Sequence, residues 1–132
     1  MADRIGVLDA VSAVTVATQT AYTVPAGCAA KVRIQFRGVA GTNSTLAILI
    51  NGMTVMTSAA LTNGNVSYST YSVMHKSDAA ASIVGSADSS TIAPFQREYF
   101  LSAGDTVQYT IGTAAFSVMD FQVVGTEVVL PT

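Results

Sequence analysis

A strand–corner–strand pattern occurs twice in this chain and limits the folds that it can adopt. The clearer copy is Tyr99–Ile111, in which an apolar run meets Ser-Ala-Gly-Asp at 102–105 and a second alternating run follows. A fainter copy is Tyr22–Ile34, which turns at Pro25-Ala26-Gly27. Short strands joined at tight corners are typical of an antiparallel β-sandwich.

Period-two alternation marks most of the remaining chain as strand. It is most regular in Lys31–Arg37, where Val32, Ile34 and Phe36 share one face. Further runs of this kind are 14–24, 45–50, 53–57, 66–74, 95–101, 106–112 and 117–129. Because no strong helical period accompanies them, we predict an all-β fold, an antiparallel β-sandwich of about eight strands.

Turn residues separate these runs. Asn51-Gly52 is the strongest short hairpin signal available, so the runs on either side of it should pair. Asp105 is best explained as a turn residue that hydrogen-bonds its own backbone. Residues 38–44 are predicted to form a loop, and Gly125 within the last run suggests a bulge or a bend.

Two segments depart from this rhythm. Residues 1–12 could form an N-terminal arm or a short strand ahead of a single β-sandwich domain, 13–132. The stretch 75–91 reads as a long loop, and loops longer than about 12–15 residues are usually functional or mobile. We therefore expect contacts with other proteins there, with these candidates: Asp3, Arg4, Ile5, His75, Lys76, Asp78, Ile83 and Val84.

The surface carries little charge. Charged residues make up 11% of the chain, against about 25% in an average soluble domain. Two interpretations compete: a monomer with a Ser- and Thr-rich surface, or a subunit whose surface is covered by its neighbours. Because charge usually keeps monomers apart and is depleted at the centre of interfaces, we favour the subunit.

The charge distribution argues against a general nucleic-acid binder, since the net charge is −2. Lys31, Arg33 and Arg37 nevertheless cluster on one predicted strand. The solvent face of that strand is the simpler interpretation, and a small basic stripe that meets an acidic partner is the alternative.

The sequence predicts neither a membrane span nor an intrachain disulfide. The longest aliphatic run, Leu46–Ile50, is far short of the roughly 20 residues that a spanning helix needs. The chain does not open with a signal-peptide pattern, so we expect a soluble protein. Cys28 is the only cysteine, and we expect it to be buried and structural, with an intermolecular disulfide as the alternative.

We find no catalytic motif. His75 is the only histidine, and it lies beside Lys76 and Asp78 in the predicted loop, where a solvated residue is more common than a catalytic one. No two carboxylates stand out as a glycosidase pair, and they are too sparse for a calcium loop. We expect no enzyme activity, no metal and no cofactor.

A carbohydrate site is the alternative kind of function. Tyr68 and Tyr71, with Asn65 nearby, are the best candidates for glycan contacts, although the chain has no Trp. Tyrosines near strand ends more often pack against the core with a tethered hydroxyl.

Three segments together suggest a family. Tyr22–Gly27, Ile50–Gly52 and Leu101–Val107 resemble small jelly-roll proteins of tailed bacteriophage particles, which include head decoration (cement) proteins and tail or fibre modules. The corner at Leu101–Val107 is also similar to the trimeric C1q/TNF-like jelly rolls. The resemblance implies a jelly-roll-like sandwich and a structural role without enzyme activity.

The resemblance implies a homotrimer that binds the major capsid protein or other virion subunits. From the net charge and the short apolar runs we expect no nucleic-acid and no membrane partner. Such a protein is made in the host cytoplasm and resides on the capsid surface. A decoration protein that bridges capsid subunits stabilises the head because it is a ligand of the assembled state. The alternative is a tail or fibre module that binds a host receptor or glycan.

Overall fold

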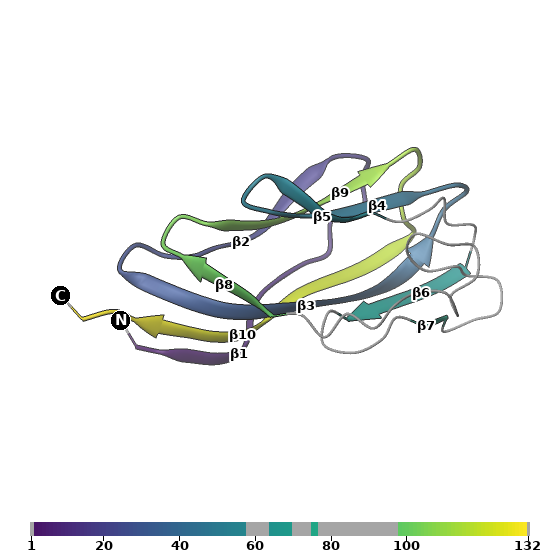
Figure 1. The fold of residues 1–132 in the computed structure, drawn as a ribbon. Helices are drawn as coiled ribbons and strands as arrows, with labels where there is room; N and C mark the ends of the chain where they lie inside the picture. Colours follow the sequence, from purple (N-terminus) through teal and green to yellow (C-terminus); the bar gives the residue numbers. More distant parts are fainter. Residues whose placement is uncertain (1, 58–63, 70–74, 77–97, 132) are drawn as a thin grey trace.

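The computed structural model describes residues 2–57 and 98–131, together with strand segments at 64–69 and 75–76. These residues form two antiparallel sheets that lie face to face (Figure 1). The strands are β1 (Arg4–Val11), β2 (Thr18–Thr23), β3 (Cys28–Ala40), β4 (Thr45–Ile50), β5 (Met53–Thr57), β6 (Gly64–Ser69), β7 (His75–Lys76), β8 (Tyr99–Ser102), β9 (Thr106–Gly112) and β10 (Val118–Val129).

The strand order is that of a jelly roll. Sheet A has the order β1-β10-β3-β6-β7, with β8 also paired to β3, and sheet B has the order β2-β9-β4-β5. β8 pairs with residues 29–32 of β3 and β6 with residues 35–40, so they share one side of that strand. If β6 and β8 are counted together as the sixth strand and the short β7 is left aside, β9 becomes the seventh strand and β10 the eighth. The orders are then 1-8-3-6 in sheet A and 2-7-4-5 in sheet B. This double Greek key confirms the predicted all-β sandwich.

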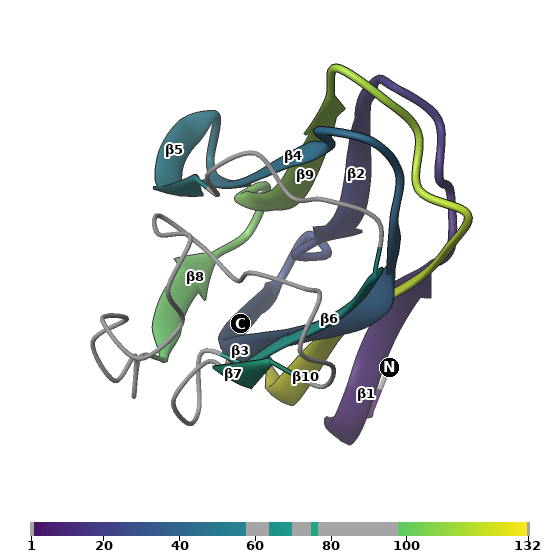
Figure 2. The same cartoon turned by 90° about the vertical axis from the view of Figure 1, so that its right-hand side faces the viewer.

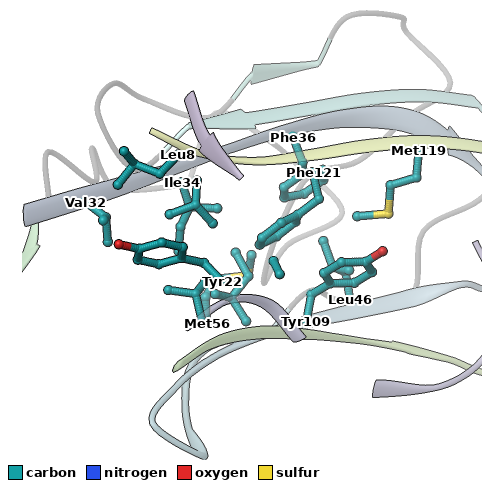
Figure 3. Packing of buried hydrophobic residues seen from close by; sticks show 14 of the residues in the cluster. Leu8, Tyr22, Val32, Ile34, Phe36, Leu46, Met56, Tyr109, Met119 and Phe121 are labelled. Atoms are coloured by element: carbon teal, nitrogen blue, oxygen red, sulfur yellow. The ribbon is translucent and has the colours of Figure 1, made fainter. Parts of the chain in front are cut away.

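The core lies between the two sheets (Figure 3). Val32, Ile34 and Phe36 of β3 are buried, as their alternation predicted. The ring of Phe121 in β10 stacks on Phe36, with centroids 6.2 Å apart, and on Tyr109 of β9 in the opposite sheet, 4.5 Å apart. Aromatic stacking therefore joins the two sheets at the centre of the sandwich.

The two corners recognised in the sequence lie side by side. The amide of Val24 donates to the carbonyl of Asp105 at 3.0 Å, and the amide of Gly104 donates to the carbonyl of Val24 at 2.9 Å. The carboxylate of Asp105 accepts from the amide of Ser102 at 2.9 Å, which confirms its predicted role in the turn. The repeated motif thus forms one hydrogen-bonded end of the sandwich.

The Asn51-Gly52 hairpin is also confirmed, because β4 and β5 pair on either side of it. Both turn residues have positive φ, 54° and 80°, as a type I′ turn requires. Cys28 is buried, as expected. The described residues contain no helix long and apolar enough to cross a membrane.

Two predictions about glycines were wrong. The loop expected from Gly38 begins later, because β3 continues to Ala40. Gly125 forms no bulge, since its pairing with Val32 on one side and Gly6 on the other is regular. A Cβ at either position would collide with a backbone carbonyl oxygen, of Val118 at Gly38 and of Lys31 at Gly125. Both glycines allow close approach of β10 and β3.

Candidate protein interface

The outer face of sheet A is the most distinctive surface among the described residues. We define it as Ile5 and Val7 of β1, the odd-numbered residues 29–39 of β3, Phe100 and Ser102 of β8, and the even-numbered residues 118–128 of β10. In β3, β8 and β10 these positions alternate with the side chains that face the core, because successive residues of a strand point to opposite faces.

Large apolar side chains are exposed on this face. Ile5 is 85% exposed, Phe100 79%, Val118 60% and Val7 54%. Most of the other large hydrophobic residues of the described chain are buried between the sheets. Isolated exposed hydrophobics are normal, whereas several on one face are typical of surfaces that bind proteins, membranes or ligands.

The strand register places four side chains in one line across sheet A: Ile5, Thr126, Lys31 and Phe100. Figure 2 shows β1 and β8 on either side of β10 and β3. At about 4.8 Å between strands, the line extends over roughly 14 Å.

A shallow groove of about 480 Å³ opens between Phe100 of β8 and Val128 of β10. Its other walls include Ala29, Lys31 and Thr126. We call it the Phe100 groove. It is large enough for an apolar side chain, and Lys31 supplies a cation at its border.

The cations of β3 form a second feature of the same face. Lys31 and Arg37 are exposed and Arg33 is half-buried, and we call these three residues the β3 basic stripe. Within residues 2–57 and 98–131, the other cationic side chain is Arg4. Asp120 lies opposite Arg37 in the register and is the acidic member of the face.

The N-terminal candidates are held by their own chain. Asp3 accepts a hydrogen bond from the amide of Val129 at 2.8 Å. Arg4 donates to the carboxylate of Glu127 through Nε at 3.0 Å and Nη2 at 2.7 Å. These contacts fix the start of β1 against the end of β10. Ile5, the next residue of β1, has the opposite orientation and projects from the outer face.

Glu127 is the centre of this arrangement. Its side chain is 2% exposed, and its carboxylate also accepts from the hydroxyl of Tyr22 at 2.6 Å. The hydrogen bonds from Arg4, with a smaller contribution from Tyr22, outweigh the effect of burial and lower the pKa of Glu127. Burial and the neighbouring carboxylate raise the pKa of Tyr22, which stays protonated as the donor. We call Arg4, Tyr22 and Glu127 the Glu127 network.

The remaining predicted contact residues lie elsewhere or outside the described residues. His75 and Lys76 form β7, at the edge of sheet A opposite β1. Asn65 and Tyr68 belong to β6. Outside the described residues lie Tyr71, Asp78, Ile83 and Val84. The described residues contain no group of three or more His, Cys, Asp or Glu side chains that could hold a metal ion.

Sequence reasoning missed Phe100, Val7 and Val128. Alternation around the buried Leu101 could have pointed to Phe100, which takes the opposite phase. That signal was weak because Tyr99, Phe100 and Leu101 are all apolar.

No protein-family model and no curated protein sequence matches the chain. Among solved structures, it is similar to the catalytic domain of Agl-KA, with 16% identity and a TM-score of 0.35 over 93% of this chain and 22% of that one. It is also similar to a chain of infectious bursal disease virus, Gt strain, with 14% identity and a TM-score of 0.35 over 95% and 31%. A third is the insecticidal delta-endotoxin Cry8Ea1 of Bacillus thuringiensis, with 15% identity and a TM-score of 0.28 over 74% and 15%.

The chain spans less than a third of each of these three proteins. At these TM-scores the likenesses assign neither a family nor a function.

Proposed function

We propose that this chain is a non-enzymatic structural protein that docks on another protein through the outer face of sheet A. The observation that carries the proposal is the exposure of Ile5, Val7 and Phe100 on one face of sheet A. The low charge of the whole chain, 11% of its residues, supports it, because interfaces are depleted of charge at their centre.

The assembly that we propose is a phage head, in which the chain is a capsid decoration (cement) protein. The support is the resemblance of its corners and hairpin to small virion jelly rolls, together with a jelly-roll strand order. In this proposal the protein is a homotrimer, its partner is the major capsid protein, and its location is the capsid surface. A rigid sandwich that covers a junction between capsid subunits stabilises the assembled state.

The exposed apolar side chains would supply a substantial part of the free energy that favours docking. Burying one side chain of this size contributes about 1.5–3 kcal/mol. Ile5 and Phe100, which are 85% and 79% exposed, would therefore contribute about 3–5 kcal/mol together on docking. Aromatic side chains that enter a partner's pocket usually dominate such interfaces, so Phe100 is the residue to test first.

The test is co-sedimentation with empty capsids of the phage that encodes the chain. We expect the wild-type protein to bind and Phe100→Ser to bind at least about tenfold more weakly, because the substitution removes about 1.5–3 kcal/mol of apolar burial. Met53→Ser is the matched control, since Met53 is 73% exposed but lies on β5 in sheet B. Equal loss in both variants would contradict the assignment of this face.

A glycan array tests the alternative function, a tail or fibre module that binds a host receptor or glycan. Strong glycan binding without affinity for capsids would exclude the decoration role and favour a receptor-binding tail module, with Asn65, Tyr68 and Tyr71 as the residues to substitute next.

A further inference from the structure

The outer face of sheet A combines its apolar side chains with positive charge. Lys31 stands at the border of the Phe100 groove, and Arg33 and Arg37 continue the same face along β3. An interface that only buried apolar surface would not need a cation beside the groove. The cations therefore indicate the charge of the partner, which the exposed hydrophobic side chains do not.

We propose that the Phe100 groove and the β3 basic stripe bind an acidic protein segment, with an apolar side chain in the groove and carboxylates over the cations. This inference rests on the proposed function, because it names the chemistry of the surface on which the chain docks. In the decoration role, the segment belongs to the capsid protein.

The geometry suits an extended segment. Lys31 and Arg37 are six residues apart on one strand, so their Cα atoms are about 20 Å apart. An apolar side chain that enters the groove next to Phe100 would bring its neighbours in the sequence over Lys31. Residues further along the segment would then reach Arg37.

The centre of the face is polar and can also bind backbone. Gln35 of β3 and Gln122 of β10 lie between Arg33 and Arg37, and the Gln35 amide donates to the Gln122 carbonyl oxygen at 2.7 Å. Amide side chains that are joined in this way keep donors and acceptors for a partner.

The composition of the face favours a protein over other anionic partners. Nucleic-acid interfaces commonly use about 6–10 phosphate contacts, and lipid-binding clusters hold about 4–8 cations. Here three cations and one carboxylate, Asp120 opposite Arg37, share the face with Gln35 and Gln122. Ile5, Val7 and Phe100 border it. Aromatic side chains and Arg beside polar groups are typical of protein interfaces.

The first experiment compares Lys31→Ala/Arg37→Ala with Thr54→Glu/Thr57→Glu. Both double variants change the net charge by the same amount, but Thr54 and Thr57 are exposed on β5 in sheet B. Binding to the same empty capsids is measured at about 50 mM and about 500 mM NaCl, where screening differs severalfold. Melting curves verify that each variant is folded.

We expect Lys31→Ala/Arg37→Ala to bind about tenfold more weakly at low salt, with a difference that shrinks at high salt, because exposed ion pairs are screened. The Thr54→Glu/Thr57→Glu control should stay close to the wild type. Suppose that Phe100→Ser loses capsid binding while Lys31→Ala/Arg37→Ala binds as the wild type does at both salt concentrations. The inference of an acidic partner is then wrong, but the proposal that the chain docks through this face is retained.

The second experiment uses a probe that does not depend on the capsid. A synthetic peptide with one Phe flanked by Asp residues is titrated into the protein beside a counterpart with Asn in place of Asp. We expect the Asp peptide alone to shift the NMR signals of Lys31, Phe100 and Thr126. That result would keep the inference even if capsids did not bind and the proposed function failed.

Three results would overturn the inference. Equal shifts with the Asp and Asn peptides would remove the role of charge. Tight, cation-dependent binding to oligonucleotides or to phosphatidylserine vesicles, with no response to the Asp peptide, would replace the protein partner. A loss of self-association in Lys31→Ala/Arg37→Ala, with unchanged capsid binding, would assign the stripe to contacts between copies of this chain.

Discussion

The hydroxyl of Tyr22 should be a major single contribution to the stability of the sandwich. Tyr22→Phe removes only that oxygen, which donates to the carboxylate of Glu127 at 2.6 Å. Both side chains are buried, with 3% and 2% of their surface exposed, so water cannot replace the lost donor. The ring remains in place, and the substitution leaves no cavity of consequence.

The expected cost follows from the charge of the acceptor. A hydrogen bond to a charged group contributes about 1.5–3 kcal/mol, and a neutral one about 1 kcal/mol. We therefore expect Tyr22→Phe to lower the free energy of unfolding by about 2 kcal/mol. For a chain of 132 residues the entropy of unfolding is about 0.28 kcal/mol/K, so the Tm should fall by about 7 °C.

Two other tyrosines provide an internal scale. The hydroxyl of Tyr109 donates to a neutral acceptor, the carbonyl of Ala13, at 2.8 Å, so Tyr109→Phe should cost about 1 kcal/mol. Tyr99 is half-buried, and its hydroxyl has no hydrogen-bond partner among the described residues, so Tyr99→Phe should be nearly neutral. Urea and thermal unfolding at pH 7 measure all three. If Tyr22→Phe lies within about 0.5 kcal/mol of Tyr99→Phe, a charged buried acceptor does not stabilise this fold as argued.

Two further predictions concern β10. The hydrogen bonds from Arg4 hold the pKa of Glu127 below its ordinary value of 4.5, so the stability from this carboxylate is present above pH 4.5 and is lost as the pH falls through the lowered value. Glu127→Gln should flatten that dependence in melting curves taken across the acid range, and an unchanged slope would assign it to other groups. Gly125→Ala should destabilise by about 3 kcal/mol in urea unfolding, because the new Cβ meets the carbonyl of Lys31. A loss below about 1 kcal/mol would show that β10 and β3 can separate at that point.

The sequence was sufficient wherever the cause of a structure is local. The alternation of Val32, Ile34 and Phe36 predicted their burial, because the two faces of a strand differ only in environment. The dipeptide Asn51-Gly52 predicted the hairpin, because both residue types accept the positive φ that the turn requires, and the short side chain of Asp105 predicted the turn. Each of these depends on a few neighbouring residues.

The errors at Gly38 and Gly125 have a cause that is not local. Each glycine was interpreted as an interruption of its strand, yet both lie within regular pairing. The requirement for glycine comes from a carbonyl on the neighbouring strand, more than 70 residues away in the sequence. Only the register of β3 with β10 shows that requirement, and one sequence does not contain it.

The interface was also hidden from local reasoning. Local patterns predict contacts in the long loop and at the N-terminus, because alternating strands are typical of the scaffold. Lys31 and Phe100 are far apart in the chain and become neighbours only through the pairing of β3 with β8. The basic stripe was recognised as three cations on one strand face, but its apolar border comes from three other strands.

The Glu127 network connects the stability of the sandwich with its proposed docking face. Arg4 and Glu127 are directly paired in the register of β1 with β10, and the next outward positions of β1 are Ile5 and Val7. Arg4 therefore holds in place the strand that supplies one border of the face. Removing the N-terminal strand would expose a buried carboxylate and would also delete Ile5 and Val7. A truncation that abolished docking would confound these two causes, whereas Phe100→Ser alters the opposite border and leaves the network intact.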